Sequence, residues 1–143
     1  MSAADELARK IAAHLRASEG TGAAWNIEIE EAREGYARIA MVVRKDMLNG
    51  HAICHGGMIF SLSDTAFAYA CNSRNMETVA QNATISFLAP GREGDRLVAE
   101  CREQALTGRS GVYAVTVTNQ KGEKIAVFQG LSRSLGGPVF KPD

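Results

Sequence analysis

The stretch "HAICHGGMIFSLSDTAFAYACNS", residues 51–73, decides the fold. From Gly56 onward its apolar residues leave almost no wholly polar face, which is typical of a helix surrounded by protein. We therefore predict a helix over 56–73 with a sheet wrapped around it. Asp64 conflicts with this environment, because an unpaired carboxylate costs several kcal/mol to bury. A compensating partner or a function is expected for it.

The segments that flank this helix are rich in β-forming residues. Before it, alternation over 25–43 with a turn at Glu34–Gly35 predicts a hairpin. After it, turn-bounded runs predict strands over 78–87, 96–105, 112–118 and 124–134. This spacing predicts a meandering antiparallel sheet. One long helix with such a sheet is an α+β domain.

The two ends of the chain are expected to differ. Apolar residues at every fourth position over 5–17 predict an amphipathic helix, which a turn at Gly20 and Gly22 ends. Gly and Pro residues predict an irregular tail over 135–143. We expect a single domain over 1–143, with the N-terminal helix inside 1–22.

Composition excludes several classes of function. The 143 residues carry 16 basic and 16 acidic side chains, so bulk charge indicates neither a nucleic-acid partner nor an anionic membrane. Three cysteines without a CxxC pair fit a reducing compartment. The charged N-terminus is not a secretory signal, and no apolar run approaches the ~18 residues of a membrane span. We expect a soluble, cytoplasmic protein.

Asp64 has two interpretations. It could lie on a narrow solvent-exposed stripe with Ser61 and Thr65. Alternatively, it could be a general base or nucleophile whose pKa is tuned by dry surroundings.

The start of the same helix favours the catalytic interpretation. His55 is followed by Gly56 and Gly57, which have no side chains, and by the unsatisfied N–H groups of a helix N-terminus. Such groups suit a carbonyl oxygen that becomes negative during acyl transfer. A tight turn or close packing would equally explain the two glycines if they stood alone.

Helix geometry limits how these parts can act together. Asp64 follows Gly56 by eight residues, which places them about 12 Å apart along one helix. A reacting carbonyl must be about 3 Å from its oxyanion donors and close to its base. One chain can hardly supply both groups, so a shared site requires Asp64 from one copy to face Gly56 of another.

The chain resembles a known enzyme family at several motifs. "LNGHAICHGGMIFSLSDTAFAYACNS", "ISFLAPGREGDRL", "TGRSGVYAVTV" and "AVFQG" closely resemble the hotdog-fold acyl-CoA thioesterases of bacterial phenylacetic acid degradation, over about 25–137. The resemblance implies a long central helix wrapped by a five- to six-stranded antiparallel sheet. It also implies obligate homodimers joined edge to edge, commonly paired into homotetramers.

The resemblance implies roles for four residues at the centre of the expected site. Asp64 resembles the family's catalytic carboxylate, and Gly56 resembles the residue whose N–H polarises the thioester carbonyl. Asn49 resembles the side chain that orients water or the partner's carboxylate, and His55 resembles the histidine that helps to place the carbonyl. Gly57 accompanies Gly56 in binding the substrate.

Further positions are assigned less directly. Some relatives supply a Ser or Thr after the helix, where this chain has Gln81, Asn82 and Thr84 without indicating which takes the role. Relatives often bind the nucleotide end of coenzyme A near the turn that here contains Arg109 and Ser110, although Arg109 could equally be a surface cation.

Aromatic residues of the helix could also contact the substrate. Phe60 and Phe67 could line an aryl pocket, although apolar helix residues are more often core.

Two rival sites lack supporting spacing. His51, Cys54 and His55 are close in sequence, but no paired metal-ligand spacing accompanies them, so no metal is expected. Cys54 next to His55 could form a nucleophile pair, but adjacent side chains entering a helix usually diverge.

The sequence therefore predicts hydrolysis of an aryl-acetyl CoA thioester, with coenzyme A as part of the substrate and no separate cofactor. An acyl-thioester hydratase or dehydratase and a non-catalytic CoA-thioester sensor are the alternatives.

Overall fold

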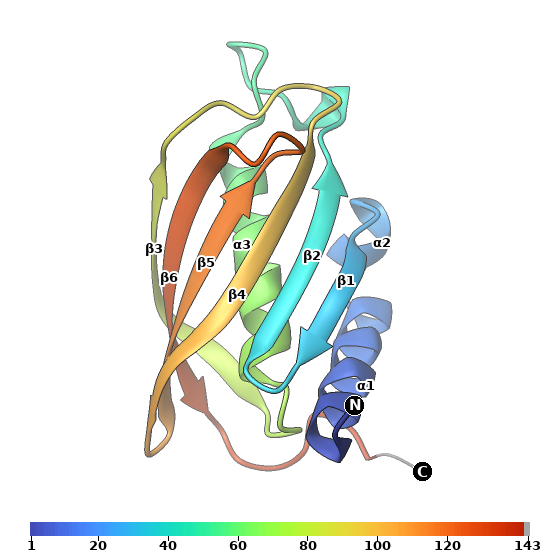
Figure 1. The fold of residues 1–143 in the computed structure, drawn as a ribbon, viewed down its shortest axis with the longest axis vertical. Coiled ribbons are helices and arrows are strands. Elements are labelled where there is room, and N and C mark those ends of the chain that lie inside the picture. Colours follow the sequence, from blue (N-terminus) through green and yellow to red (C-terminus); the bar gives the residue numbers. More distant parts are fainter. Residues whose placement is uncertain (142–143) are drawn as a thin grey trace.

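A long helix packed on one antiparallel sheet organises the structure, which is a computed structural model describing residues 1–141. The helix, α3 (Gly56–Cys71), lies behind the sheet in Figure 1. It ends two residues earlier than predicted because Asn72 caps it. The Asn72 side-chain nitrogen donates to the carbonyls of Ala68, at 2.9 Å, and Thr78, at 3.0 Å. This cap turns the chain from the helix into the following strand.

The sheet has six strands, in agreement with the predicted α+β hotdog class. Their bounds are β1 (Glu28–Arg33), β2 (Tyr36–Val42), β3 (Thr78–Phe87), β4 (Arg96–Thr107), β5 (Ser110–Thr118) and β6 (Lys124–Ser134). All neighbouring strands are antiparallel, in the order β1-β2-β4-β5-β6-β3. The loop between β2 and α3 contains a single 3-10 turn, η1 (Lys45–Met47).

The position of β3 differs from the predicted meander. β2 pairs with β4, and β3 pairs with β6 at the opposite edge of the sheet. The reason is that α3 separates β2 from β3 in the sequence and crosses the face of the sheet, so the chain re-enters the sheet at its far edge (Figure 1). In the described part of the chain, residues 1–141, β3 therefore has one edge without a neighbouring strand.

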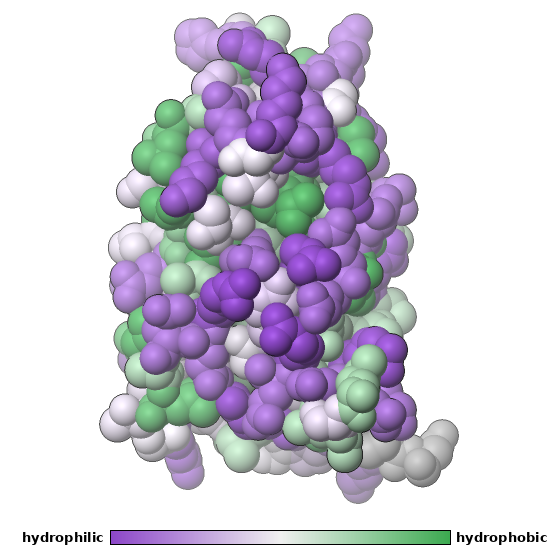
Figure 2. Space-filling view, in the orientation of Figure 1, coloured by the Kyte–Doolittle hydropathy of each residue, from purple (hydrophilic) through white to green (hydrophobic). Residues whose placement is uncertain are grey.

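The core lies between α3 and the sheet. Leu62 and Ala66 of α3 are fully buried, and so are Leu97, Ala99 and Val117 of the central strands. The opposite face of the sheet is largely polar with scattered apolar side chains (Figure 2). Within residues 1–141, no helix is long and apolar enough to cross a membrane.

The N-terminal segment forms two helices where one was predicted. α1 (Ala3–Ser18) contains the expected amphipathic pattern and packs on β1 and α3. The predicted turn at Gly20 and Gly22 is instead a second short helix, α2 (Gly20–Ala24). Gly22 allows α2 to pack closely against the end of α1, because a Cβ at this position would lie 2.6 Å from the Arg16 carbonyl oxygen.

The C-terminal segment after β6 has no helix or strand over 135–141, in agreement with the predicted irregular tail; residues 142–143 of that prediction lie outside the described residues. The segment is nevertheless fixed. Asn75 donates to the Phe140 carbonyl at 3.0 Å, and the Phe140 ring stacks on His14 of α1.

Gly130 of β6 offers a test of how closely α3 packs on the sheet. A Cβ at Gly130 would lie 2.6–2.8 Å from the ring of Phe67, which is 1% exposed. We expect Gly130→Ala to lower the free energy of unfolding by about 1–3 kcal/mol through overpacking, measured by chemical denaturation. Gly20→Ala is the matched control, because no heavy atom lies within 4 Å of its Cβ position. Equal stability of the two variants would contradict this packing.

Candidate functional site

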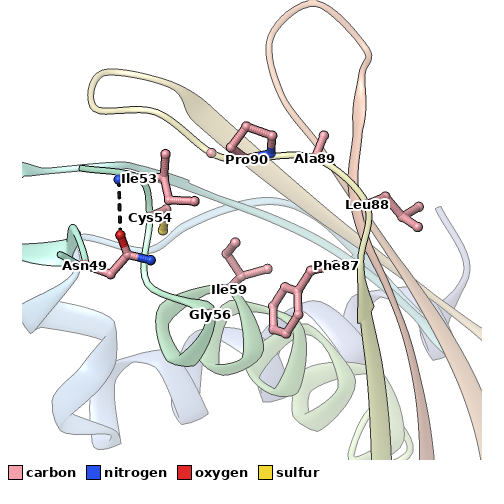
Figure 3. Close-up of a pocket in the computed structure, with 10 residues that line it drawn as sticks. Asn49, Ile53, Cys54, Gly56, Ile59, Phe87, Leu88, Ala89 and Pro90 are labelled. Atoms are coloured by element: carbon pink, nitrogen blue, oxygen red, sulfur yellow. Dashed lines mark hydrogen bonds between the residues drawn. The ribbon is translucent and has the colours of Figure 1, made fainter. Parts of the chain in front are cut away.

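A hollow of about 500 Å³ lies at the N-terminus of α3 (Figure 3). We name it the Gly56 hollow. One wall comes from the loop before α3 and the first turn of the helix, and the other from the end of β3 and the loop after it. Its lining residues are Asn49, Ile53, Cys54, Gly56, Ile59, Phe87, Leu88, Ala89, Pro90 and Gly91.

The first N–H group of α3 is available to a ligand. The Gly57 N–H donates to His55 Nδ1 at 2.8 Å, and the Met58 and Ile59 N–H groups donate to the His55 carbonyl. Within residues 1–141 the Gly56 N–H has no acceptor. Because a helix N-terminus also favours negative charge, this N–H is a donor suited to a polarised carbonyl oxygen.

His55 and Gly57 act together as the helix cap. The exposed His55 ring accepts through Nδ1, which assigns the proton of the neutral ring to Nε2. A Cβ at Gly57 would lie 3.0 Å from that Nδ1, so the glycine permits the close cap. In this structure the Gly57 N–H donates to His55, and the predicted substrate-binding role of Gly57 stays a prediction.

Asn49 is oriented by the loop that contains it. Its side-chain oxygen accepts from the His51 N–H at 2.8 Å and more weakly from the Ile53 N–H at 3.4 Å. The amide nitrogen points toward the hollow (Figure 3). Because the oxygen is occupied, Asn49 presents N–H donors, which can bind an anionic carboxylate or orient a water molecule through one of its lone pairs.

Phe87 of β3 closes the hollow over the glycine. A Cβ at Gly56 would lie 3.0 Å from the Phe87 Cζ atom, although the phenylalanine is 53% exposed. A larger residue at position 56 would therefore displace this ring or fill the hollow.

Asp64 lies in a different hollow, of about 250 Å³, which we name the Asp64 hollow. Its lining residues are Glu19, Thr21, Trp25, Phe60, Ser61, Asp64, Thr65 and Ala68. Within residues 1–141 the Asp64 carboxylate has no hydrogen-bond or ion-pair partner among those the structure describes. Burial raises its pKa above the ordinary range of an aspartate.

The surroundings of Asp64 do not match a simple solvent-exposed stripe. Thr65 is only 8% exposed, and its hydroxyl donates to the Ser61 carbonyl at 2.7 Å. Asp64 and Ser61 are half-buried at the wall of the hollow. The carboxylate thus has no compensating partner among the described residues, and it is not fully solvated either.

The two hollows are separate in one chain. Gly56 and Asp64 are both on α3, eight residues and about 12 Å apart, and no residue lines both hollows. A single thioester carbonyl cannot contact both groups of one chain, as the helix spacing indicated.

Arg109 and Ser110 lie at the opposite end of α3 from Gly56. They line a third hollow together with Cys71, Thr78 and Ser134. Arg109 is exposed, and its carbonyl accepts from the Ser134 N–H at 2.8 Å. In one chain this turn is therefore not joined to the Gly56 hollow.

Gln81, Asn82 and Thr84 are all exposed on β3. Gln81 is the extra residue of a β-bulge between Ala80 and Asn82. Thr84 lines a hollow on the outer face of the sheet beside Gln129, its cross-strand partner. Thr84 therefore faces away from α3 of its own chain.

The two helix phenylalanines differ in position. Phe60 lines the Asp64 hollow and packs edge-on to Phe128, with ring centroids 5.5 Å apart. Phe67 is buried between Gly130, Tyr113 and Phe128. The structure thus places Phe67 in the core of its own chain, the second of the two alternatives predicted for it, because the face of α3 that carries Phe67 packs on β5 and β6.

Cys54 and the histidines do not form a reactive or metal-binding cluster. Burial raises the pKa of the Cys54 thiol to about 11, which disfavours the nucleophilic thiolate. Within residues 1–141, no group of three or more His, Cys, Asp or Glu side chains is placed to hold a metal ion.

Sequence reasoning missed Glu19, Thr21 and Trp25, which belong to α2 and its flanking residues and share the hollow of Asp64. The approach of a segment about 40 residues away has no local signal in the sequence. The sequence marks Trp25 only as the first residue of the alternating run over 25–43.

Asp64→Asn tests the environment of this carboxylate through stability. Because burial raises the folded-state pKa, the stability that the protonated carboxyl contributes is present below the ordinary aspartate pKa and is lost as pH rises through the raised value. We expect the variant to have a higher Tm than the parent at about pH 8 and a smaller difference at about pH 4.

Asp95→Asn is the matched control with the opposite sign. The Gln120 side-chain hydrogen bond lowers the pKa of Asp95, so the charged carboxylate stabilises the fold. Replacing that carboxylate by an amide should therefore reduce the Tm at the higher pH. An Asp64 variant that is less stable than the parent at the higher pH would contradict the assigned environment.

The chain is similar in sequence to known thioesterases. Residues 51–126 match the model of the Thioesterase superfamily. The chain is 46% identical over 116 residues to the acyl-coenzyme A thioesterase PaaI of Escherichia coli, covering 81% of this chain and 83% of that protein.

Solved structures give the same assignment. The PaaI protein from the phenylacetic acid degradation operon of E. coli superposes with a TM-score of 0.93 at 40% identity, covering 95% of this chain and 99% of that one. A hypothetical thioesterase from Streptococcus pneumoniae, solved with coenzyme A, has a TM-score of 0.76 at 26% identity, covering 79% and 88%. The chain belongs to the Thioesterase superfamily.

Proposed function

We propose that the protein hydrolyses aryl-acetyl CoA thioesters, such as phenylacetyl-CoA or hydroxyphenylacetyl-CoA, to the free acid and coenzyme A in phenylacetate degradation. The observation that carries the proposal is the Gly56 N–H, which has no acceptor among residues 1–141 and lies at a hollow at the N-terminus of α3. Family membership and the resemblance to E. coli PaaI support thioester hydrolysis. The aryl-acetyl group is the finer part of the proposal.

The proposed active site is shared by two chains. In one chain Asp64 and Gly56 line separate hollows, so Asp64 of one chain faces the partner subunit's Gly56. The open edge of β3 suits such a dimer, because Val79 and Phe87 are 44% and 53% exposed there. An unpaired, partly apolar edge strand is a template for a second chain. Two-fold symmetry then gives two identical sites per dimer, and pairs of dimers would form a tetramer.

The proposed reaction begins with the thioester carbonyl in the Gly56 hollow. Its oxygen accepts the Gly56 N–H, with His55 Nε2–H as a further donor near the helix end, and both stabilise the oxyanion that forms. The Asn49 amide donates to the partner's Asp64 carboxylate or to the attacking water. These groups orient the attack on the carbonyl.

Asp64 then acts in one of two ways. As general base it takes a proton from water, the hydroxide adds to the carbonyl carbon, and the intermediate collapses with release of the coenzyme A thiolate. As nucleophile it attacks the carbonyl itself, releases the same thiolate and leaves an anhydride that water hydrolyses. Either route produces one acid and one thiol from one thioester and one water.

The two alternative functions, a hydratase or dehydratase and a CoA-thioester sensor, would need different features at the site. A hydratase or dehydratase would use a histidine together with an acidic side chain to act on the acyl chain, whereas here His55 caps α3 through Nδ1. A CoA-thioester sensor would not need the carboxylate of Asp64, which is half-buried without a compensating partner. Both features favour hydrolysis.

Replacing Asp64 tests the reaction. We expect Asp64→Asn to lower kcat by about 10²–10⁴-fold, because the amide can neither accept the proton nor attack, and to leave the fold intact. Release of free thiol from phenylacetyl-CoA measures the rate. Asp46→Asn, an exposed carboxylate paired with Arg44, is the control and should retain parental activity. Full activity of the Asp64 variant would exclude the proposed role.

Mixed dimers test the sharing of the site. Gly56→Val should be inactive because its side chain meets the Phe87 ring, and Asp64→Asn should be inactive for want of the carboxylate. After subunit exchange, half of the dimers are mixed and each holds one intact site, so about a quarter of the parental activity should return. Native mass spectrometry verifies the exchange. Proven mixed dimers without recovered activity would contradict a two-chain site.

A further inference from the structure

The Asp64 hollow has a second wall that the proposed chemistry does not use. α3 supplies Phe60, Ser61 and Asp64, whereas Glu19, Thr21 and Trp25 come from the segment around α2. This N-terminal segment lies outside residues 51–126, which match the family model. Trp25 is the single tryptophan of the chain. A large aromatic side chain thus lies in the same hollow as the reactive carboxylate.

We propose that Trp25 is a specificity-determining residue whose indole ring contacts the acyl group of the thioester. This inference rests on the proposed function, because a carbonyl attacked from Asp64 must place the atoms next to it at the mouth of the Asp64 hollow. Phe60 and Ala68 add apolar surface to that hollow. Aromatic side chains contact an aryl ring favourably in edge-to-face or offset arrangements, so this lining suits an aryl-acetyl group.

The wall that carries Trp25 is held from several sides. The Tyr69 hydroxyl of α3 donates to the Glu19 carboxylate. The Arg44 guanidinium donates to the Ala24 carbonyl at 2.8 Å.

The backbone on either side of Trp25 is fixed as well. Arg16 donates to the Ile27 carbonyl at 3.0 Å, and the Gly22 carbonyl accepts from the Ile27 N–H at 2.9 Å. A wall fixed at so many points can exclude an acyl group that does not fit, whereas a mobile segment would adapt to it.

The competing interpretation is that Trp25 only packs α2 onto the core, which it also contacts. That role would change stability and would change the activity toward all substrates alike. A specificity role changes the ratio between substrates. The two interpretations are therefore separated by kcat/KM for different acyl groups.

Trp25→Ala and Trp25→Phe provide the first test, with phenylacetyl-CoA and acetyl-CoA as substrates. We expect the alanine variant to lose roughly 10–200-fold in kcat/KM for phenylacetyl-CoA, the range for a lost apolar contact, with a smaller change for acetyl-CoA. Trp25→Phe should recover most of the preference because it restores an aromatic face. An unchanged ratio between the two substrates in the alanine variant would overturn the proposal.

Intrinsic fluorescence provides a second test that does not depend on turnover. In the Asp64→Asn variant the emission of Trp25 should shift when phenylacetyl-CoA binds and stay nearly constant with free coenzyme A, with binding of both verified by calorimetry. Bound phenylacetyl-CoA without a change in emission would refute contact with Trp25. A shift in a protein that hydrolyses no thioester would support the acyl contact and refute the proposed function alone.

Discussion

The helix α3 is buried along most of its length, yet within residues 1–141 its first N–H group has no acceptor. The cap explains this, because His55 satisfies the Gly57 N–H through its ring and the next two through its carbonyl. The free Gly56 N–H then faces a hollow whose far wall is Phe87 and the loop after β3. The hollow forms because the end of β3 supplies its far wall and because Gly56 has no side chain to fill it.

A second constraint follows from the rigidity of the helix. Gly56 and Asp64 are fixed on α3 about 12 Å apart, and no loop motion can bring them together. Asp64 instead shares a hollow with the N-terminal segment, which leaves it half-buried and raises its pKa. A donor in one hollow and a half-buried carboxylate in another are the two parts that the proposed two-chain site brings together. On the proposed function, the free energy that the burial of Asp64 costs the fold is the consequence of keeping a carboxylate at the active site.

Much of the fold could be predicted from the sequence where the signal is local. The bounds of β3 and β6 were predicted to the residue, and α3 differs only at its capped end, because turn residues and apolar periodicity mark these elements. The position of β3 beside β6 could not be predicted, since strand order depends on contacts between distant segments. For the same reason the sequence could not predict that Trp25 lies in the same hollow as Asp64. For Phe67 the sequence leaves a pocket and the core both open, because periodicity shows that a residue is apolar without showing what it packs against.

A crystal structure of the Asp64→Asn variant with bound phenylacetyl-CoA tests the central claim most directly. The account predicts that the thioester carbonyl oxygen lies about 3 Å from the Gly56 nitrogen of one chain, with the side chain at position 64 of the partner chain facing the carbonyl carbon. A carbonyl held by both positions of a single chain, or bound away from Gly56, would contradict it.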